Sequence, residues 1–201
     1  MKKQLRFLNI DPRIAADSSV PYVVIPIPYE RTVSYGTGTA KGPSAILKAS
    51  MEIEDFDEEL KANLNLAVQT RKAISFKNLS EEKSMELIKQ TASTEFKNNR
   101  FLLALGGEHS ITAPLVDAAL RYGGIKSVLQ LDAHTDLRDE FRGKSLSHAC
   151  VMHRCRKLGI KTVHAGIRSC SSTEYEYIRR GQIPVFWADE IISAQNEGWI
   201  E

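Results

Sequence analysis

A short apolar segment that ends in acids and a histidine constrains the fold of this chain more than any other part of its sequence. The segment runs from Val128 to Asp136 and reads VLQLDAHTD, a pattern that predicts a buried strand followed by polar residues. In an extended chain alternate side chains share a face, so we expect Asp132, His134 and Asp136 to point the same way. Carboxylates and an imidazole packed that closely repel and desolvate badly unless a cation lies among them. The segment therefore predicts a metal site, or half of one.

A second strand with a polar end precedes it in the chain. Arg100 to Leu105 reads RFLLAL, which indicates a buried strand, and the sequence Gly-Gly-Glu-His-Ser follows at 106–110. The two glycines allow a tight turn and a close approach of the backbone, and Ser110 is expected to cap the next helix. His109 then lies at the carboxyl end of its strand, the edge of an open α/β sheet where sites assemble.

Each of these residues also has an ordinary interpretation when it is taken alone. A single histidine at a strand end is usually structural or exposed, and a single aspartate there is usually a loop cap. Two such strand ends in one chain favour metal binding. The predicted ligands are His109, Asp132, His134 and Asp136. Imidazoles and carboxylates without a thiolate favour manganese, or another hard-to-borderline cation, over a structural zinc.

Apolar strands alternate with helical segments along the rest of the chain. We predict strands within 20–29, 100–105, 125–131, 163–167 and 183–187, and helices at 80–97, 111–122, 147–158 and 171–180. Ser80 is expected to cap the first of these helices, and Ser171 with Glu174 is expected to form a capping box at the start of the last. This alternation is typical of an α/β protein with a mostly parallel sheet, here as one domain over residues 1–201. The small residues of 34–44 match no phosphate-binding pattern, so we expect a loop at the rim of the site.

Composition limits the classes of partner and the cellular location that we expect for this chain. Its 27 basic and 25 acidic residues nearly balance, so no nucleic-acid partner is expected. No apolar run approaches the roughly 20 residues that span a bilayer, and the first residues do not resemble a signal peptide. The three cysteines form no C-x-x-C pair, which favours reduced thiols and a cytoplasmic protein.

Four short motifs resemble the ureohydrolases, the arginase and agmatinase family. They are Gly-Gly-Glu-His-Ser at 106–110, Asp-Ala-His-Thr-Asp at 132–136, Ser147-His148, and Gly-Ile-Arg-Ser at 166–169. The resemblance spans essentially the whole chain, and the sequence most resembles the agmatinase branch of the family. It implies a three-layer α/β/α fold and a binuclear manganese site. It also implies homo-oligomers.

The same resemblance assigns roles to individual residues. His109, Asp132 and Asp136 would hold one manganese ion, and His134 would hold the other, with Asp132 bridging the two. Water acidified by the two ions would attack the carbon of a guanidinium group. His148 would be the proton shuttle that helps the amine to leave, although taken alone it reads as a capping-turn histidine.

The substrate is expected to be a small guanidine. Arginases recognise an amino-acid head group partly through an acid just after the Gly-Ile/Leu-Arg motif, and this chain has Ser169 there. Ser169 offers no carboxylate to an α-ammonium group, so we predict agmatine as substrate, with urea and putrescine as products. Arginine, guanidinobutyrate and guanidinopropionate are the alternatives. A deacetylase-like zinc hydrolase is a more distant one, because that class lacks this pair of motifs.

One part of the family pattern is not found in the 201 residues. A further strand with the pattern S-x-D-x-D-x-x-D-P supplies two more aspartate ligands in the family, and a glutamate beyond it contacts the guanidinium. The last two family strands lie between the strand that ends at His109 and the strand that ends at Asp132. We therefore expect a fragment of a longer protein, missing its last strands, with a gap of about 10 Å in the sheet. By itself this chain is expected to be inactive and to bind at most one metal.

Overall fold

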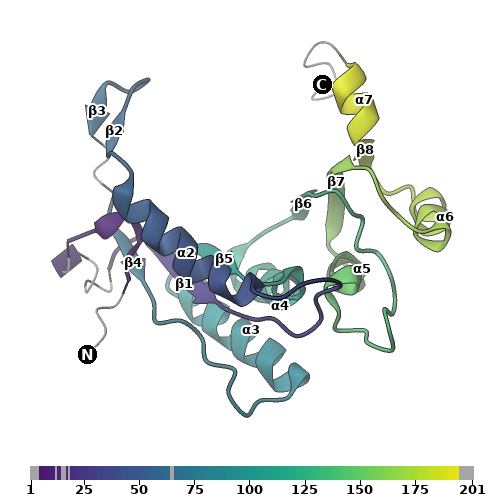
Figure 1. The fold of residues 1–201 in the computed structure, drawn as a ribbon, viewed down its shortest axis with the longest axis horizontal. Helices are drawn as coiled ribbons and strands as arrows, with labels where there is room; N and C mark the ends of the chain where they lie inside the picture. The colour runs from purple at the N-terminus through teal and green to yellow at the C-terminus, as the bar shows by residue number, and fades with distance from the viewer. Residues whose placement is uncertain (1–4, 12, 15–16, 18, 64–65, 195–201) are drawn as a thin grey trace.

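The computed structural model describes residues 5–11, 13–14, 17, 19–63 and 66–194. Its first sheet has the strand order β4-β1-β5, with bounds Val68–Thr70, Tyr22–Ile27 and Phe101–Gly106 (Figure 1). All pairs in this sheet are parallel. The pairing of β1 with β5 runs from Tyr22 beside Phe101 to Ile27 beside Gly106. Strand β5 therefore ends at Gly106, the first residue of the Gly-Gly-Glu-His-Ser motif.

Helices cover both faces of this sheet. The side chains of β1 alternate, as expected of a strand buried on both sides. One set (Val23, Ile25 and Ile27) packs with Ile88 of helix α3, Glu81–Lys97. Val24 faces the other way and packs with Leu47 of helix α2, Gly42–Ala49. This arrangement gives three layers, as predicted.

A second parallel sheet has the order β6-β7-β8. Its strands are Ser127–Leu131, Lys161–Ile167 and Val185–Trp187. Three helices pack together beside it: α4 (Thr112–Ala118), α5 (Val151–Lys157) and α6 (Ser172–Gly181). Buried apolar residues from all three helices form one core cluster, against which the partly buried Val128 and Val185 of the sheet also pack.

The facing strands of the two sheets do not pair. Among the described residues β5 pairs only with β1, and β6 pairs only with β7. Apolar side chains on these two strands are exposed: Phe101 by 66%, Leu103 by 40%, Leu129 by 63% and Leu131 by 76%. Strands of a parallel sheet are normally buried on both faces. The structure thus leaves one edge of β5 and one edge of β6 unpaired among the described residues, which agrees with the missing strands that the family resemblance implies.

The remaining elements are short. Strands β2 (Phe56–Asp57) and β3 (Ala62–Asn63) form a hairpin, and helix α7 spans Ala188–Ser193. The 3-10 helices are η1 (Phe7–Asn9), η2 (Thr39–Lys41), η3 (Ser50–Glu52), η4 (His109–Ile111) and η6 (His148–Cys150). A π-helical segment, η5 (Ala119–Gly123), continues α4. No helix in the described part of the chain has the length and apolarity needed to cross a membrane.

Two sequence-based details need correction. The helix predicted at 111–122 is divided into a 3-10 turn, α4 and η5. Ser110 does not cap it, because Ser110 lies inside η4 and its hydroxyl donates to Glu108 instead. By contrast, Ser80 caps α3 as predicted, accepting from the backbone of Lys83.

Candidate metal centre

The Asp-Ala-His-Thr-Asp segment is a loop and does not continue the strand. Strand β6 ends at Leu131, so the expectation that alternation along a strand would align the three side chains was wrong. The end of β7 holds the start of this loop instead. The backbone N–H of Asp132 donates to the carbonyl of Ala165 at 3.1 Å. The N–H groups of Arg168 and Ser169 both donate to the carbonyl of Ala133.

Gly166 makes this contact between β7 and the loop possible. Its φ of +83° is in the left-handed region, and the pairing of β7 with β8 is irregular between Ala165 and Ile167. Side chains other than hydrogen are strained at such a φ. A Cβ on Gly166 would also lie 3.4 Å from the carbonyl oxygen of Asp132. The glycine of the Gly-Ile-Arg-Ser motif thus shapes the backbone that carries the first predicted ligand.

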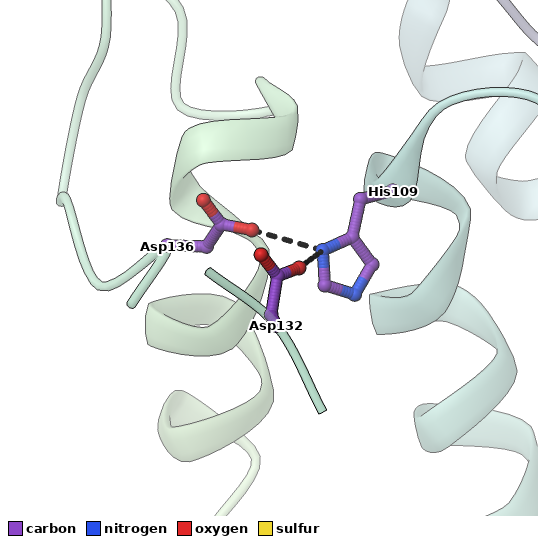
Figure 2. A group of neighbouring side chains, drawn as sticks. All are labelled: His109, Asp132 and Asp136. Atoms are coloured by element: carbon purple, nitrogen blue, oxygen red, sulfur yellow. Dashed lines mark hydrogen bonds and ion pairs between the residues drawn. The ribbon is translucent and has the colours of Figure 1, made fainter. Parts of the chain in front are cut away.

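Three of the four predicted ligands converge (Figure 2). Nδ1 of His109 lies 2.9 Å from Oδ2 of Asp136 and 3.6 Å from Oδ2 of Asp132. The possible ligand atoms of His109, Asp132 and Asp136 all lie within 4.8 Å of one another. One imidazole nitrogen and two carboxylates are a donor set that fits a hard-to-borderline divalent cation. The residues present therefore fit the predicted metal.

His134 lies at the edge of this group. Its Nδ1 is 3.7 Å from Oδ1 of Asp132, and its side chain is 65% exposed. The two oxygens of Asp132 thus face different imidazoles, Oδ2 toward His109 and Oδ1 toward His134. The backbone N–H of His134 also donates to Oδ1 at 2.9 Å and orients the carboxylate. A bridging role for Asp132 is compatible with this arrangement and stays a prediction.

Asp136 is held in an uncommon backbone conformation. Its φ of +50° lies in the left-handed region, where aspartate is more tolerated than most residues. Its carbonyl accepts hydrogen bonds from the N–H groups of Met152 and His153, in the first turn of α5. The first turn of a helix has N–H groups without partners inside the helix. Helix α5 therefore fixes the backbone from which Asp136 reaches the site.

Glu174 of helix α6 supports the same loop from the other side. It was predicted only as the second member of a capping box with Ser171, and that box is present. The carboxylate, which is buried, also accepts from the hydroxyl of Thr135 and the N–H of Leu137. Burial opposes its ionisation, but these hydrogen bonds and those from Ser171 outweigh burial, so the pKa of Glu174 lies below its ordinary value.

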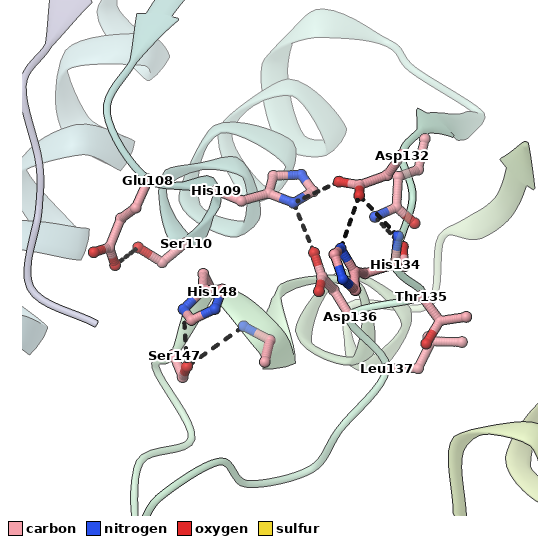
Figure 3. Close-up of polar contacts among 12 residues, drawn as sticks. Glu108, His109, Ser110, Asp132, His134, Thr135, Asp136, Leu137, Ser147 and His148 are labelled. Atoms are coloured by element: carbon pink, nitrogen blue, oxygen red, sulfur yellow. Dashed lines mark hydrogen bonds and ion pairs between the residues drawn. The ribbon is translucent and has the colours of Figure 1, made fainter. Parts of the chain in front are cut away.

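His148, the predicted proton shuttle, lines the same cleft as the metal ligands (Figure 3). It begins η6, which the side chain of Ser147 caps. Its Nδ1 lies 3.3 Å from the hydroxyl of Thr32, and its Nε2 lies 3.0 Å from the hydroxyl of Ser34. The cleft has a volume of about 390 Å³. Its lining includes Ser34, Phe141, His148 and Ser169 besides the four predicted ligands.

Sequence reasoning missed the buried carboxylate beside His109. Glu108 is only 4% exposed, and it accepts four hydrogen bonds, from Ser110 and from the loop that contains Thr32. Its neighbour Gly107 packs so closely on Tyr29 that an added Cβ would lie 2.1 Å from the carbonyl oxygen there. The Gly-Gly-Glu-His-Ser motif did predict a close approach of backbones. Nothing in the sequence indicated which segment Glu108 would meet.

The other two histidines do not line the cleft. His164 is fully buried, with Nδ1 2.5 Å from Oε1 of Gln130 and Nε2 3.0 Å from the hydroxyl of Thr162. Burial lowers the pKa of His164 to about 4, with a smaller contribution from Arg156. His153 lies 3.2 Å from the carboxylate of Asp139. Neither of them is among the predicted ligands. The three cysteines are free thiols, as expected.

Comparison with known proteins identifies the family. The sequence pattern of the Arginase family matches residues 20–201. A Synechocystis protein named N(1)-aminopropylagmatine ureohydrolase is 39% identical over 192 residues, which are 92% of this chain and 61% of that protein. An agmatinase from Pyrococcus horikoshii is 34% identical over 178 residues, which are 83% of this chain and 57% of that protein.

A solved structure has the same fold. Proclavaminate amidino hydrolase from Streptomyces clavuligerus superposes with a TM-score of 0.80 at 25% identity, covering 96% of this chain and 66% of that one. The chain spans about three fifths of the length of the two curated relatives. The matched pattern covers the described strands and helices from β1 to α7 and every predicted site residue. This chain therefore belongs to the arginase family.

Proposed function

We propose that the whole protein is a metal-dependent amidinohydrolase, which cleaves the guanidinium group of a small amine to give urea and the corresponding amine. The observation that carries this proposal is the convergence of His109, Asp132 and Asp136 at the ends of β5 and β6. Membership of the arginase family supports it. Because the chain spans only part of its relatives, the activity is assigned to the whole protein.

We propose manganese as the metal. His109, Asp132 and Asp136 would hold one ion, and His134 would contribute to a second. When bound, a divalent cation supplies Lewis acidity and lowers the pKa of water enough for attack at neutral pH. The donors of these four residues are carboxylate oxygens and imidazole nitrogens, which suit manganese better than a structural zinc. Ligands from outside the 201 residues would complete the second site.

His148 would move the proton in this reaction. It lines the cleft with the ligands, and Nε2 of its ring lies 3.0 Å from the hydroxyl of Ser34. The departing amine needs a proton as the carbon–nitrogen bond breaks, and an imidazole is suited to supply one near neutral pH. Phe141 meets the ring of His148 edge to face, with the ring centroids 5.9 Å apart.

The substrate that we propose is a guanidine without an amino-acid head group. Ser169 lines the cleft and carries no charge that would pair with an α-ammonium group. The relative with 39% identity is named for N(1)-aminopropylagmatine, and the relative with 34% identity is named for agmatine. We therefore place N(1)-aminopropylagmatine first and agmatine, the substrate predicted from the sequence, second. A single domain, homo-oligomers and a cytoplasmic location also remain proposals.

Urea release tests the proposal directly. The protein from the complete reading frame and the 201-residue chain would each be supplied with Mn²⁺. Each would be offered N(1)-aminopropylagmatine, agmatine, arginine and 4-guanidinobutyrate. We expect urea from the first two substrates with the complete protein, and none after Asp132→Asn. Absence of urea from all four substrates with the complete protein would overturn the proposal. Urea from arginine alone would overturn the choice of substrate.

A further inference from the structure

We propose that Glu108 and Thr32 act as positioning residues for His148 and hold its neutral ring in the tautomer with the proton on Nδ1. The unprotonated Nε2 is then the ring atom that exchanges protons in the cleft. The tautomer follows from hydrogen bonds alone, while its use in catalysis rests on the proposed function. A chain of hydrogen bonds runs from the buried carboxylate of Glu108 through the hydroxyl of Thr32 to His148.

Glu108 is an acceptor on both of its oxygens. Its Oε2 receives the backbone N–H groups of Arg31 and Thr32, at 2.6 and 2.7 Å. Its Oε1 receives the hydroxyls of Thr32 and Ser110, each at 2.6 Å. Distances this short are typical of hydrogen bonds to an ionised carboxylate. The carboxylate is buried, so it has little access to water that could replace these donors.

The hydroxyl of Thr32 has one proton, and Glu108 receives it. The oxygen of Thr32 then has only lone pairs left for its other neighbours. One neighbour is the backbone N–H of His148, which donates to it at 3.1 Å. The other is Nδ1 of the same histidine, at 3.3 Å. A lone pair on Nδ1 would face a lone pair on Thr32, so the favourable arrangement has the proton on Nδ1.

Ser147 is the second neighbour of Nδ1. Its hydroxyl oxygen also lies 3.3 Å from Nδ1, and it accepts the N–H of Ala149 as the cap of η6. Ser147 alone could donate to Nδ1 or accept from it, because a hydroxyl does both. Thr32 has no such freedom once Glu108 holds its proton. Thr32 therefore decides the tautomer, and Ser147 adapts to it.

The other ring nitrogen is left free for proton exchange. With the proton on Nδ1, Nε2 carries a lone pair and accepts from the hydroxyl of Ser34 at 3.0 Å. When Nε2 takes up a proton, the hydroxyl of Ser34 rotates and accepts instead. Ser34 and His148 both line the cleft that contains the metal ligands. Nε2 is thus prepared both to take up and to release a proton on the side of the ring where Ser34 lies.

One short motif then serves both functions of the site. Glu108 and His109 are adjacent, so the turn after β5 carries a predicted metal ligand and the carboxylate that orients His148. The loop with Thr32 reaches this turn from β1, where the N–H of Glu108 donates to the carbonyl of Tyr29. Close packing of Gly107 on Tyr29 keeps the two segments together.

The tautomer is measurable without metal or substrate. Two-bond ¹H–¹⁵N correlation spectra of the metal-free 201-residue chain separate protonated from unprotonated ring nitrogens. Comparison with the spectrum of His148→Gln assigns the signals of this ring. The spectra are recorded at a pH high enough for the ring to be neutral. We expect a protonated Nδ1 and an unprotonated Nε2. We expect Thr32→Val to lose this pattern and Thr32→Ser to retain it. Ser147→Ala and Ser34→Ala, as matched controls, should retain it as well.

A wild-type ring protonated on Nε2 would overturn the proposal. So would an unchanged pattern in a folded Thr32→Val chain, or a pattern lost in Ser147→Ala and kept in Thr32→Val. Thermal unfolding shows whether each variant is folded, and the wild-type spectrum remains decisive if Thr32→Val is not. Urea release plays no part in these spectra, so the proposed function and the tautomer fail or succeed separately.

Discussion

Oε1 of Glu174 lies 2.7 Å from the hydroxyl oxygen of Thr135, with Thr135 donating, and 3.1 Å from the backbone nitrogen of Leu137. One buried carboxylate on α6 thus holds the residues on both sides of Asp136. The backbone of Asp136 has a positive φ, which is unfavourable for a residue with a side chain. Fixing its two neighbours from a rigid helix is a physical means of keeping that conformation.

Glu174→Gln tests this relationship. The amide keeps the shape of the carboxylate but replaces one acceptor by a donor, which then faces groups that also donate, such as the N–H of Leu137. We expect a loss of about 1–3 kcal/mol in the free energy of unfolding, measured with urea. Glu176→Gln on the exposed side of the same helix is the control and should change little. Equal effects of the two changes would contradict the role of Glu174.

Manganese binding by the 201-residue chain can be measured by calorimetric titration. Two carboxylates and one imidazole converge within the described residues, and His134 lies only at the edge. We therefore expect one weak site per chain. Asp132→Asn should weaken it at least tenfold, because it removes half of the anionic charge that faces the cation. Asp139→Asn, at an exposed carboxylate that pairs with Lys157, should leave the affinity unchanged. Two tight sites would contradict this expectation.

The sequence predicted those features of the fold that depend on local patterns. Apolar runs identified β1, β5, β6 and β7, and their polar ends placed His109 beside Asp132 because parallel strands end at one edge. Capping residues predicted the starts of α3 and α6, at Ser80 and Ser171. These signals are local, since each depends on residues only a few positions apart.

The supporting contacts could not be predicted because they join distant parts of the chain. Thr32 and Glu108 are 76 positions apart, and Thr135 and Glu174 are 39 apart. In both pairs the hydrogen bond depends on which segments pack together, which a single sequence does not specify. The loop conformation at Asp136 was likewise missed, because alternation along a strand was assumed beyond Leu131.

His164 predicts how stability changes in acid. Its ordinary pKa is 6.5, and burial lowers the folded-state pKa to about 4. Above pH 6.5 the ring is neutral in both states. As the pH falls from 6.5 toward 4, the unfolded chain binds a proton that the folded chain does not, so the free energy of unfolding falls. The shift corresponds to a loss of up to about 3 kcal/mol.

Urea unfolding of the wild type and of His164→Gln, at pH 7.5 and at pH 4.5, measures this effect. The variant lacks the titrating ring, so its stability should fall less between the two pH values than that of the wild type. His153 is a useful control, because the pKa of its ring is also lowered by burial but its Nε2 faces Asp139. His153→Gln should change the pH dependence less than His164→Gln. The same slope for wild type and His164→Gln would contradict the prediction.

The unpaired strands β5 and β6 predict self-association of the 201-residue chain. Leu129 and Leu131 are the most exposed leucines of the second sheet, at 63% and 76%, and β6 has an edge without a strand partner among the described residues. An exposed apolar strand edge is a template for pairing with another chain.

The double substitution Leu129→Lys with Leu131→Lys tests this prediction. Burying a leucine side chain contributes about 1.5–3 kcal/mol, and lysine removes that contribution at both positions, so the double variant should associate at least tenfold more weakly. Leu60→Lys is a matched control, since Leu60 is 69% exposed and lies between β2 and β3, outside the gap. Sedimentation velocity over a range of protein concentrations measures the association. A wild-type chain that stays monomeric at every concentration would contradict the prediction. Equal weakening by Leu60→Lys would contradict the assignment of the association to β6.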